Sequence, residues 1–293
     1  MQFEIDSFRA SDLGVERFLE DYYLPEKPVL LTGVNPPEEQ YFWKIARHQK
    51  ARQGFGFIGA PLDHQVDHLI TPDIVSAVLE RGDVVTRKLP VRAWMNPKHH
   101  RTFTHYDGNS LHGLNWQITG AKRWTLISPD TPPALYPFSY FAMTHEPFRP
   151  DGRKHDFCEF DCKVGDLLFL PRYWCHAVTS LEDRNINLNW VVTPRAPNLD
   201  NLVGRRECGI LRWRDLIPQI DRIIYQASSI HNYAEGGEEM FQAYAKSLSN
   251  WQLLRVLMVE IASLALLPLY RSSVRQGANN LDRQSDFVGN ADS

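Results

Sequence analysis

The stretch from about residue 91 to residue 194 constrains the fold most, because it is a series of short β-type segments separated by turn residues. Each segment is rich in β-branched, aliphatic or aromatic residues, and no amphipathic helical pattern lies between them. Such spacing favours an antiparallel sandwich or barrel. The expected strands cover residues 114–120, 122–128, 157–163, 166–170 and 186–193.

The segments before this β-rich stretch mix helical and extended patterns. Residues 11–23 place their apolar side chains on one side of a predicted helix, and residues 27–31 read as a buried strand. Residues 51–68 have no clear periodicity, so we expect a long loop there. We assign residues 1–195 to one mainly β domain with N-terminal α/β elements.

The segments after the β-rich stretch predict a C-terminal helical bundle over residues 196–272. Residues 216–230 and 240–248 repeat apolar side chains at helical spacing. Residues 251–267 are apolar around most of a helix, which requires burial either in a homodimer interface or against the β domain. Residues 273–293 are polar, and we expect a disordered tail.

Composition excludes several classes of protein. The net charge of −3 provides no basic excess for nucleic acid, so we expect none as a partner. Residues 253–270 are interrupted by Arg255, Glu260 and Pro268, which argues against a membrane span. The N-terminus lacks the pattern of a secretory signal, and the four cysteines show no zinc-site spacing. We therefore expect a cytoplasmic protein with reduced thiols.

Three residues form a candidate metal site. His105 and Asp107 are two positions apart, so both would project from the same face of a strand. His176 follows a segment that reads as a turn, a buried strand and a proline-terminated end. Two imidazoles and one carboxylate suit a non-haem iron(II) that activates dioxygen. The spacing alone does not decide between this site and structural histidines.

Lys122 is the second candidate feature, because it begins the segment after the His105 segment. If its side chain points into the barrel, the buried ammonium needs an anionic partner, which the carboxylate of a co-substrate would supply. The opposite register would place Arg123 inside and Lys122 outside. Periodicity leaves both registers open.

Together these segments resemble the JmjC and cupin-8 family of oxygenases. The resemblance runs from about residue 18 to residue 192 and rests on three blocks in a specific order. The blocks are Pro28-Val29-Leu30-Leu31-Thr32-Gly33; Thr104-His105-Tyr106-Asp107 with Gln117-Ile118-Thr119-Gly120-Ala121-Lys122-Arg123-Trp124; and Gly165-Asp166-Leu167-Leu168-Phe169-Leu170-Pro171 through His176 to Asn187-Leu188-Asn189-Trp190.

The resemblance implies a double-stranded β-helix, the jelly-roll of cupins, with iron(II), 2-oxoglutarate and dioxygen as reactants. It implies that His105, Asp107 and His176 are both the catalytic residues and the metal ligands. The residues implied to bind the co-substrate are Lys122, Thr102, Asn189 and Asn115. Gly113 stands where the family has an asparagine, with Asn109 and Asn115 nearby.

The implied function is a dioxygenase that releases succinate and carbon dioxide. We expect it to hydroxylate an amino-acid side chain in a protein, a peptide or a free amino acid or small molecule. Three alternatives stay open: a non-catalytic cupin that acts as a scaffold, an RNA-modifying hydroxylase of the same family, and a zinc-dependent cupin. The family's helical C-terminal element also implies a homodimer.

Overall fold

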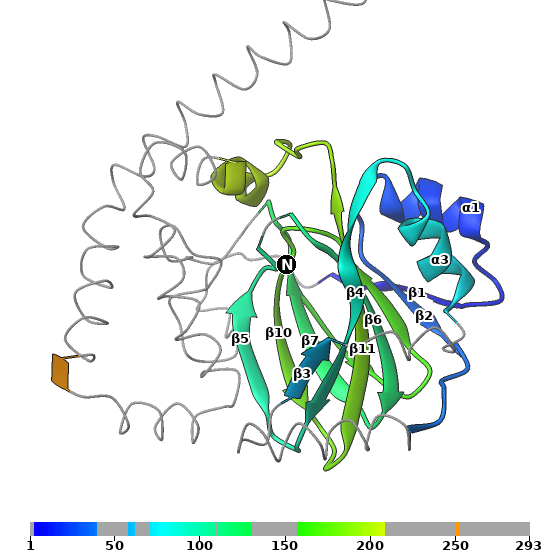
Figure 1. The fold of residues 1–293 in the computed structure, drawn as a ribbon, viewed down its shortest axis with the longest axis vertical. Coiled ribbons are helices and arrows are strands. Elements are labelled where there is room, and N and C mark those ends of the chain that lie inside the picture. The colour runs from blue at the N-terminus through cyan, green and yellow to red at the C-terminus, as the bar shows by residue number, and fades with distance from the viewer. Residues whose placement is uncertain are drawn as a thin grey trace, which may run out of the picture.

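The computed structural model describes residues 3–39, 58–61, 71–108, 110–130, 157–208 and 250–251. Within these ranges the strands form two sheets, of seven and four strands, that face each other (Figure 1). The larger sheet has the order β1 (Asp6–Arg9), β2 (Val29–Thr32), β9 (Leu167–Leu170), β6 (His112–Thr119), β11 (Asn185–Pro194), β4 (Val84–Asn96) and β3 (Ile58–Pro61). The smaller sheet has the order β5 (Arg101–His105), β10 (Cys175–Ser180), β7 (Lys122–Ile127) and β8 (Phe157–Cys162).

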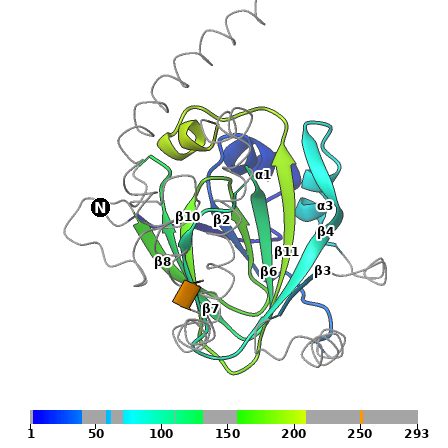
Figure 2. The same cartoon turned by 60° about the vertical axis from the view of Figure 1, so that its left-hand side comes forward.

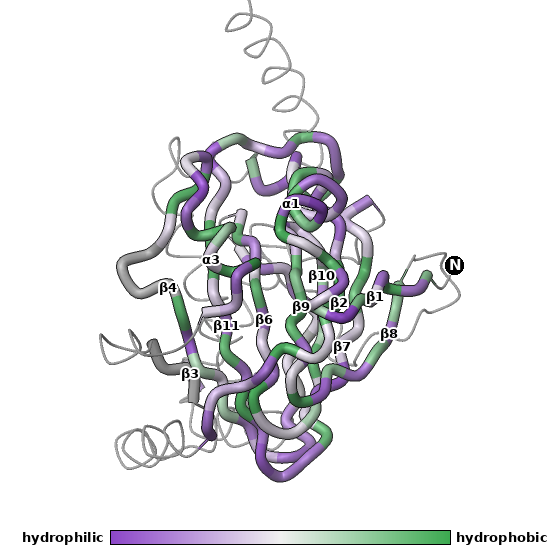
Figure 3. The backbone as a smooth tube through the Cα atoms, turned by 90° about the vertical axis from the view of Figure 1, so that its right-hand side faces the viewer, coloured by the Kyte–Doolittle hydropathy of each residue, from purple (hydrophilic) through white to green (hydrophobic). Residues whose placement is uncertain are grey.

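Strand β11 shows how the sequence sets the two faces of the larger sheet. Residues 185–190 alternate between amides and large apolar side chains, and the tube of the strand carries both hydrophilic and hydrophobic colours (Figure 3). Successive side chains of a strand point to opposite faces. Leu188 and Trp190 therefore lie in the outer hydrophobic core, whereas Asn187 and Asn189 face the smaller sheet.

Short helices cover the outer face of the larger sheet. Helix α1 (Val15–Phe18) continues into a π-helical turn, Leu19–Tyr23, and α3 (Asp73–Leu79) packs nearby on the same face (Figures 1 and 2). Phe18 is fully buried and meets Phe169 edge to face, with ring centroids 5.3 Å apart. This packing removes one face of the sheet from solvent and leaves the other face for the site.

The space between the two sheets has an apolar side and a polar side. On one side, Trp124 and Leu126 of β7 pack with Leu168 and Leu170 of β9 in an apolar cluster. On the other side, β4, β11 and β6 present buried carboxamides. These are Asn96, Asn115, Gln117, Asn185, Asn187 and Asn189. Buried amides are costly unless they find hydrogen-bond partners, so this half of the interior suits polar ligands.

The mainly β prediction is confirmed, and the five predicted strands correspond to β6, β7, β8, β9 and β11. The loop prediction for residues 51–68 is wrong at β3, whose four residues pair with β4. The N-terminal helix begins at Val15 and not at residue 11, because β1 is followed by a turn up to Gly14.

Several predictions fall on residues outside the described ranges. The helical bundle, the polar tail and the homodimer interface all depend on such residues, although a helix begins at Leu202 and is described as far as Cys208. In the described ranges no helix is both long and apolar enough to span a bilayer. The four cysteines are free in the structure.

Candidate metal centre

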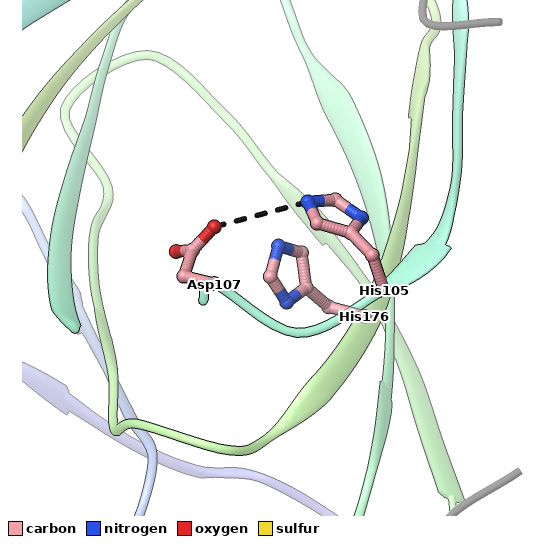
Figure 4. Close-up of side chains that lie close together, drawn as sticks. All are labelled: His105, Asp107 and His176. Atoms are coloured by element: carbon pink, nitrogen blue, oxygen red, sulfur yellow. Dashed lines mark ion pairs between the residues drawn. The ribbon is translucent and has the colours of Figure 1, made fainter. Parts of the chain in front are cut away.

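Two neighbouring strands of the smaller sheet bring His105 and His176 together. His105 is the last residue of β5, and it lies directly opposite His176 on the antiparallel strand β10. Directly opposite residues point to the same face, and the two rings are 4.2 Å apart between centroids. Both side chains are buried, and both point into the interior (Figure 4).

Asp107 joins the two histidines from a loop. The strand that would carry both His105 and Asp107 ends at His105, so the prediction that strand alternation aligns them is wrong. The chain turns after β5 and brings the carboxylate back, with Asp107 Oδ1 3.8 Å from His105 Nε2 (Figure 4). One potential ligand atom from each of the three residues lies within 4.8 Å of the others.

The Asp107 loop is held from behind by Tyr106. This side chain is fully buried in a cluster with Tyr173 and Cys175, and its ring packs against that of Tyr173 with 6.2 Å between centroids. Its hydroxyl donates a hydrogen bond to the carboxylate of Glu207 on the helix that begins at Leu202. The loop is thereby fixed to a second element of the fold.

The chain segment that precedes His176 is held in place by Arg172. Its guanidinium forms an ion pair with Glu26, with 2.7 Å between Nη2 and Oε1, and also donates to the carbonyl of Ala196 at 2.7 Å. His176 itself has Nδ1 3.0 Å from the Trp174 carbonyl oxygen. A carbonyl can only accept, so Nδ1 carries the proton and Nε2 keeps its lone pair for a metal.

Lys122 points into the interior, which decides the register that the sequence left open. Its side chain is 4% exposed, whereas Arg123 lies on the outer face and pairs with Asp161 at 2.8 Å. Lys122 Nζ donates a 2.8 Å hydrogen bond to Asn96 Oδ1. Burial lowers the pKa of Lys122 to about 7, because the charged form loses its hydration.

The remaining predicted residues also face the interior. Thr102 lies opposite Val178, and an irregularity in the β5–β10 pairing keeps Thr102 on the same face as His105. Asn189 Nδ2 donates to Asn115 Oδ1 at 2.8 Å, while the buried Asn115 Nδ2 has no hydrogen-bond partner among the described residues. A methyl group at Gly113 would lie 3.1 Å from Asn115 Nδ2 and 3.8 Å from Asp107 Oδ2, so these amides border the carboxylate.

This arrangement coincides with a recognised sequence family. The cupin-like domain family matches residues 44–191, which cover the larger part of both sheets and all three residues of the candidate site. The chain belongs to the JmjC/cupin-8 oxygenase family. The resemblance on which the sequence prediction rested is thereby confirmed.

Relatives of this JmjC/cupin-8 chain include two plant demethylases and one human protein. The arginine-specific demethylase JMJ22 of Arabidopsis thaliana is 23% identical over 83% of this chain and 59% of its own length. The lysine-specific demethylase JMJ31 of the same plant is 30% identical over 31% of this chain and 19% of its own length. HSPB1-associated protein 1 of Homo sapiens is 29% identical over 33% of this chain and 22% of its own length. The chain thus spans at most 59% of the length of each of these relatives.

Asn96 is the site residue that sequence reasoning missed. It ends β4, is 6% exposed and accepts the one hydrogen bond that Lys122 Nζ donates within the described ranges. A signal for it existed, since residues 91–96 alternate strictly between apolar side chains and larger polar or aromatic ones. Such alternation predicts a half-buried strand whose polar positions, including Asn96, share one face.

Two histidines near the site have structural surroundings. Burial lowers the pKa of His100 to about 3, and the nearby Lys122 acts in the same direction. His112 lies on the outer face of β6, accepts a hydrogen bond from the backbone nitrogen of Arg172 at 3.0 Å, and also has its pKa lowered to about 3 by burial. Both stay neutral at physiological pH, and neither belongs to the cluster of possible ligand atoms that His105, Asp107 and His176 form.

Proposed function

We propose that this chain is an iron(II)- and 2-oxoglutarate-dependent oxygenase that hydroxylates an amino-acid side chain in a protein, a peptide or a free amino acid. The observation that carries the proposal is the convergence of His105, Asp107 and His176 on one point of the interior. Two imidazoles and one carboxylate on one side of a metal leave positions for a chelating co-substrate and dioxygen. This donor set fits iron(II).

The surroundings of Lys122 fit a dicarboxylate co-substrate. Its hydrogen-bond acceptor in the described ranges is the neutral amide of Asn96, and no carboxylate forms an ion pair with it. A buried ammonium without an opposite charge is costly, and a ligand carboxylate would relieve that cost. We assign Lys122 to the far carboxylate of 2-oxoglutarate, with Thr102 beside it.

The end of the co-substrate nearer the metal would meet Asn115 and Asn189. Asn115 Nδ2 is a buried donor without an acceptor in the part of the chain that the structure describes, and the Asn189 amide donates to Oδ1 of the same side chain. When bound, iron and 2-oxoglutarate would supply the oxidising chemistry, one oxygen atom of O₂ entering succinate and the other the substrate. The chain's own residues bind, orient and exclude water around these groups.

The reaction class follows from the family, and the choice of an amino-acid side chain draws on the relatives. Two of them are named as demethylases of arginine and lysine side chains. Such side chains are long enough to reach an interior site from a protein surface. The same geometry would admit a free amino acid, so the three forms of substrate share one proposal.

Succinate formation tests this function. We expect purified protein with iron(II), 2-oxoglutarate and air to form succinate above a metal-free control, and His105→Ala to abolish it. His99→Asn is a matched control, because His99 is exposed and has a positive φ of 64° that asparagine tolerates. Absence of succinate from the iron-loaded wild type would contradict the proposal, and substrate turnover without 2-oxoglutarate would favour a zinc-dependent cupin.

A further inference from the structure

Strand β4 carries a second cation toward the interior. Its apolar residues Val91, Ala93 and Met95 all lie in the outer hydrophobic core. The residues between them must therefore point the other way, toward the smaller sheet. Arg92 is one of these residues, and it is only partly exposed.

Arg92 lies in the same row of the sheet as the amides that border the metal centre. It pairs with Asn189 on β11, and Asn189 pairs with Asn115 on β6. Asn189 Nδ2 and Asp107 Oδ2 lie 3.3 Å and 3.8 Å from the position of a methyl group on Gly113. Arg92 is thus one strand away from the groups that surround the Asp107 carboxylate.

No group of the described ranges balances the charge of Arg92. Within the described ranges the Arg92 side chain forms neither a hydrogen bond nor an ion pair. Other arginines of the described ranges do pair: Arg81 with Asp83, Arg123 with Asp161 and Arg172 with Glu26. A guanidinium stays charged at every relevant pH, so Arg92 retains a full positive charge.

The groups of the proposed function do not balance Arg92 either. The charges of iron(II), Asp107, a protonated Lys122 and a doubly charged 2-oxoglutarate cancel one another. Arg92 is an additional cation beside a neutral set of groups. In a partly desolvated setting it favours an anion and repels a second cation.

We propose, on the basis of the proposed function, that Arg92 binds a carboxylate of the substrate next to the carbon that is hydroxylated. The substrate class is then a carboxylate-bearing amino acid, either free or as an acidic residue of a peptide. A guanidinium fits a carboxylate through two parallel hydrogen bonds, which orients as well as binds it. The cationic arginine and lysine side chains named for two relatives do not suit this site.

Three small probes test the assignment by binding. The first, N-acetyl-aspartic acid amide, carries a side-chain carboxylate, and the second, N-acetyl-asparagine, carries a free α-carboxylate. The third, N-acetyl-asparagine amide, has the same shape and no charge. The protein is loaded with Mn(II) in place of iron and with saturating 2-oxoglutarate, and the paramagnetic relaxation of probe protons reports binding close to the metal.

We expect one of the two carboxylate probes to bind about tenfold more tightly than the neutral amide, as a charge-assisted pair predicts. Which of the two it is separates an acidic residue from a free amino acid. Arg92→Gln should remove the preference, and Arg92→Lys should keep part of it. Arg195→Gln, which removes an exposed arginine beyond the end of β11, should leave it intact.

Three results overturn the inference. They are equal affinity of all three probes for wild type, no relaxation effect from either carboxylate probe, and a carboxylate preference that survives in Arg92→Gln. Circular dichroism of Arg92→Gln and Arg92→Lys establishes that each variant is folded. If wild type forms succinate but the probes do not discriminate, only the role of Arg92 fails. If no succinate forms, the proposed function itself fails.

Discussion

Replacing Lys122 with methionine should make the ligand-free protein more stable while it abolishes co-substrate binding. Burial lowers the pKa of this ammonium from 10.5 to about 7. A difference of that size corresponds to about 4 kcal/mol of destabilisation by the lysine at pH 7. Methionine has a similar length and no charge, so Lys122→Met removes this cost.

Part of the gain is lost at Asn96, whose Oδ1 accepts the hydrogen bond from Lys122. An unpaired buried acceptor costs about 1–3 kcal/mol, so we expect a net stabilisation of about 2 kcal/mol. For a domain of this size that raises Tm by about 4–8 °C. Differential scanning calorimetry at pH 7 measures it, with Arg123→Met as the matched control on the exposed face of the same strand.

The dependence on pH separates this cause from simple repacking. The folded-state pKa of Lys122 lies below the unfolded-state value, so the unfolded chain binds more protons between about pH 7 and pH 10.5. The stability of wild type should therefore rise across that window relative to Lys122→Met, and the difference should vanish near its upper end. Stabilisation by 2-oxoglutarate with Mn(II) should be lost in the variant. A less stable Lys122→Met whose difference from wild type stays constant with pH would refute the reasoning.

Three further substitutions test the supports of the site. Arg172→Ala leaves the partly buried carboxylate of Glu26 without its cation, with Asn198 as its remaining donor, and should destabilise the fold by about 3 kcal/mol in urea unfolding; a loss below 1 kcal/mol would contradict the ion pair. Tyr106→Phe removes the hydrogen bond to Glu207 and should cost about 1–3 kcal/mol by the same assay, and an unchanged midpoint would argue against that anchor. Gly113→Ala places a methyl group 3.1 Å from Asn115 Nδ2. It should weaken 2-oxoglutarate binding, measured by calorimetric titration, while it leaves Tm nearly unchanged. Unchanged affinity would mean that this amide does not face the co-substrate.

The strands and their faces could be predicted from the sequence because they depend on local alternation. At the start of β11 the amides and the apolar residues occupy alternate positions, and the structure places Asn189 inside and Trp190 outside. The same holds for β6, where Trp116 packs in the outer core and Asn115 does not. One buried face is enough to fix the register of such strands.

Two features of the site could not be predicted because they depend on contacts that are distant in sequence. Asp107 reaches the two histidines from a loop, and the position of that loop is fixed by Glu207, far along the chain. The inward direction of Lys122 is set by the pairing of β7 with β8 and β10. Its acceptor, Asn96, comes from the opposite sheet, and no periodicity joins the two.

Anaerobic titration of the iron(II)-loaded protein with 2-oxoglutarate tests the central claim most directly. Chelation of iron by a keto acid produces a visible charge-transfer absorption that neither component shows alone. We expect this band to saturate at one equivalent for wild type and for His99→Asn, and to be absent from His176→Ala. A wild-type protein that binds iron and 2-oxoglutarate without the band would contradict a centre formed by His105, Asp107 and His176.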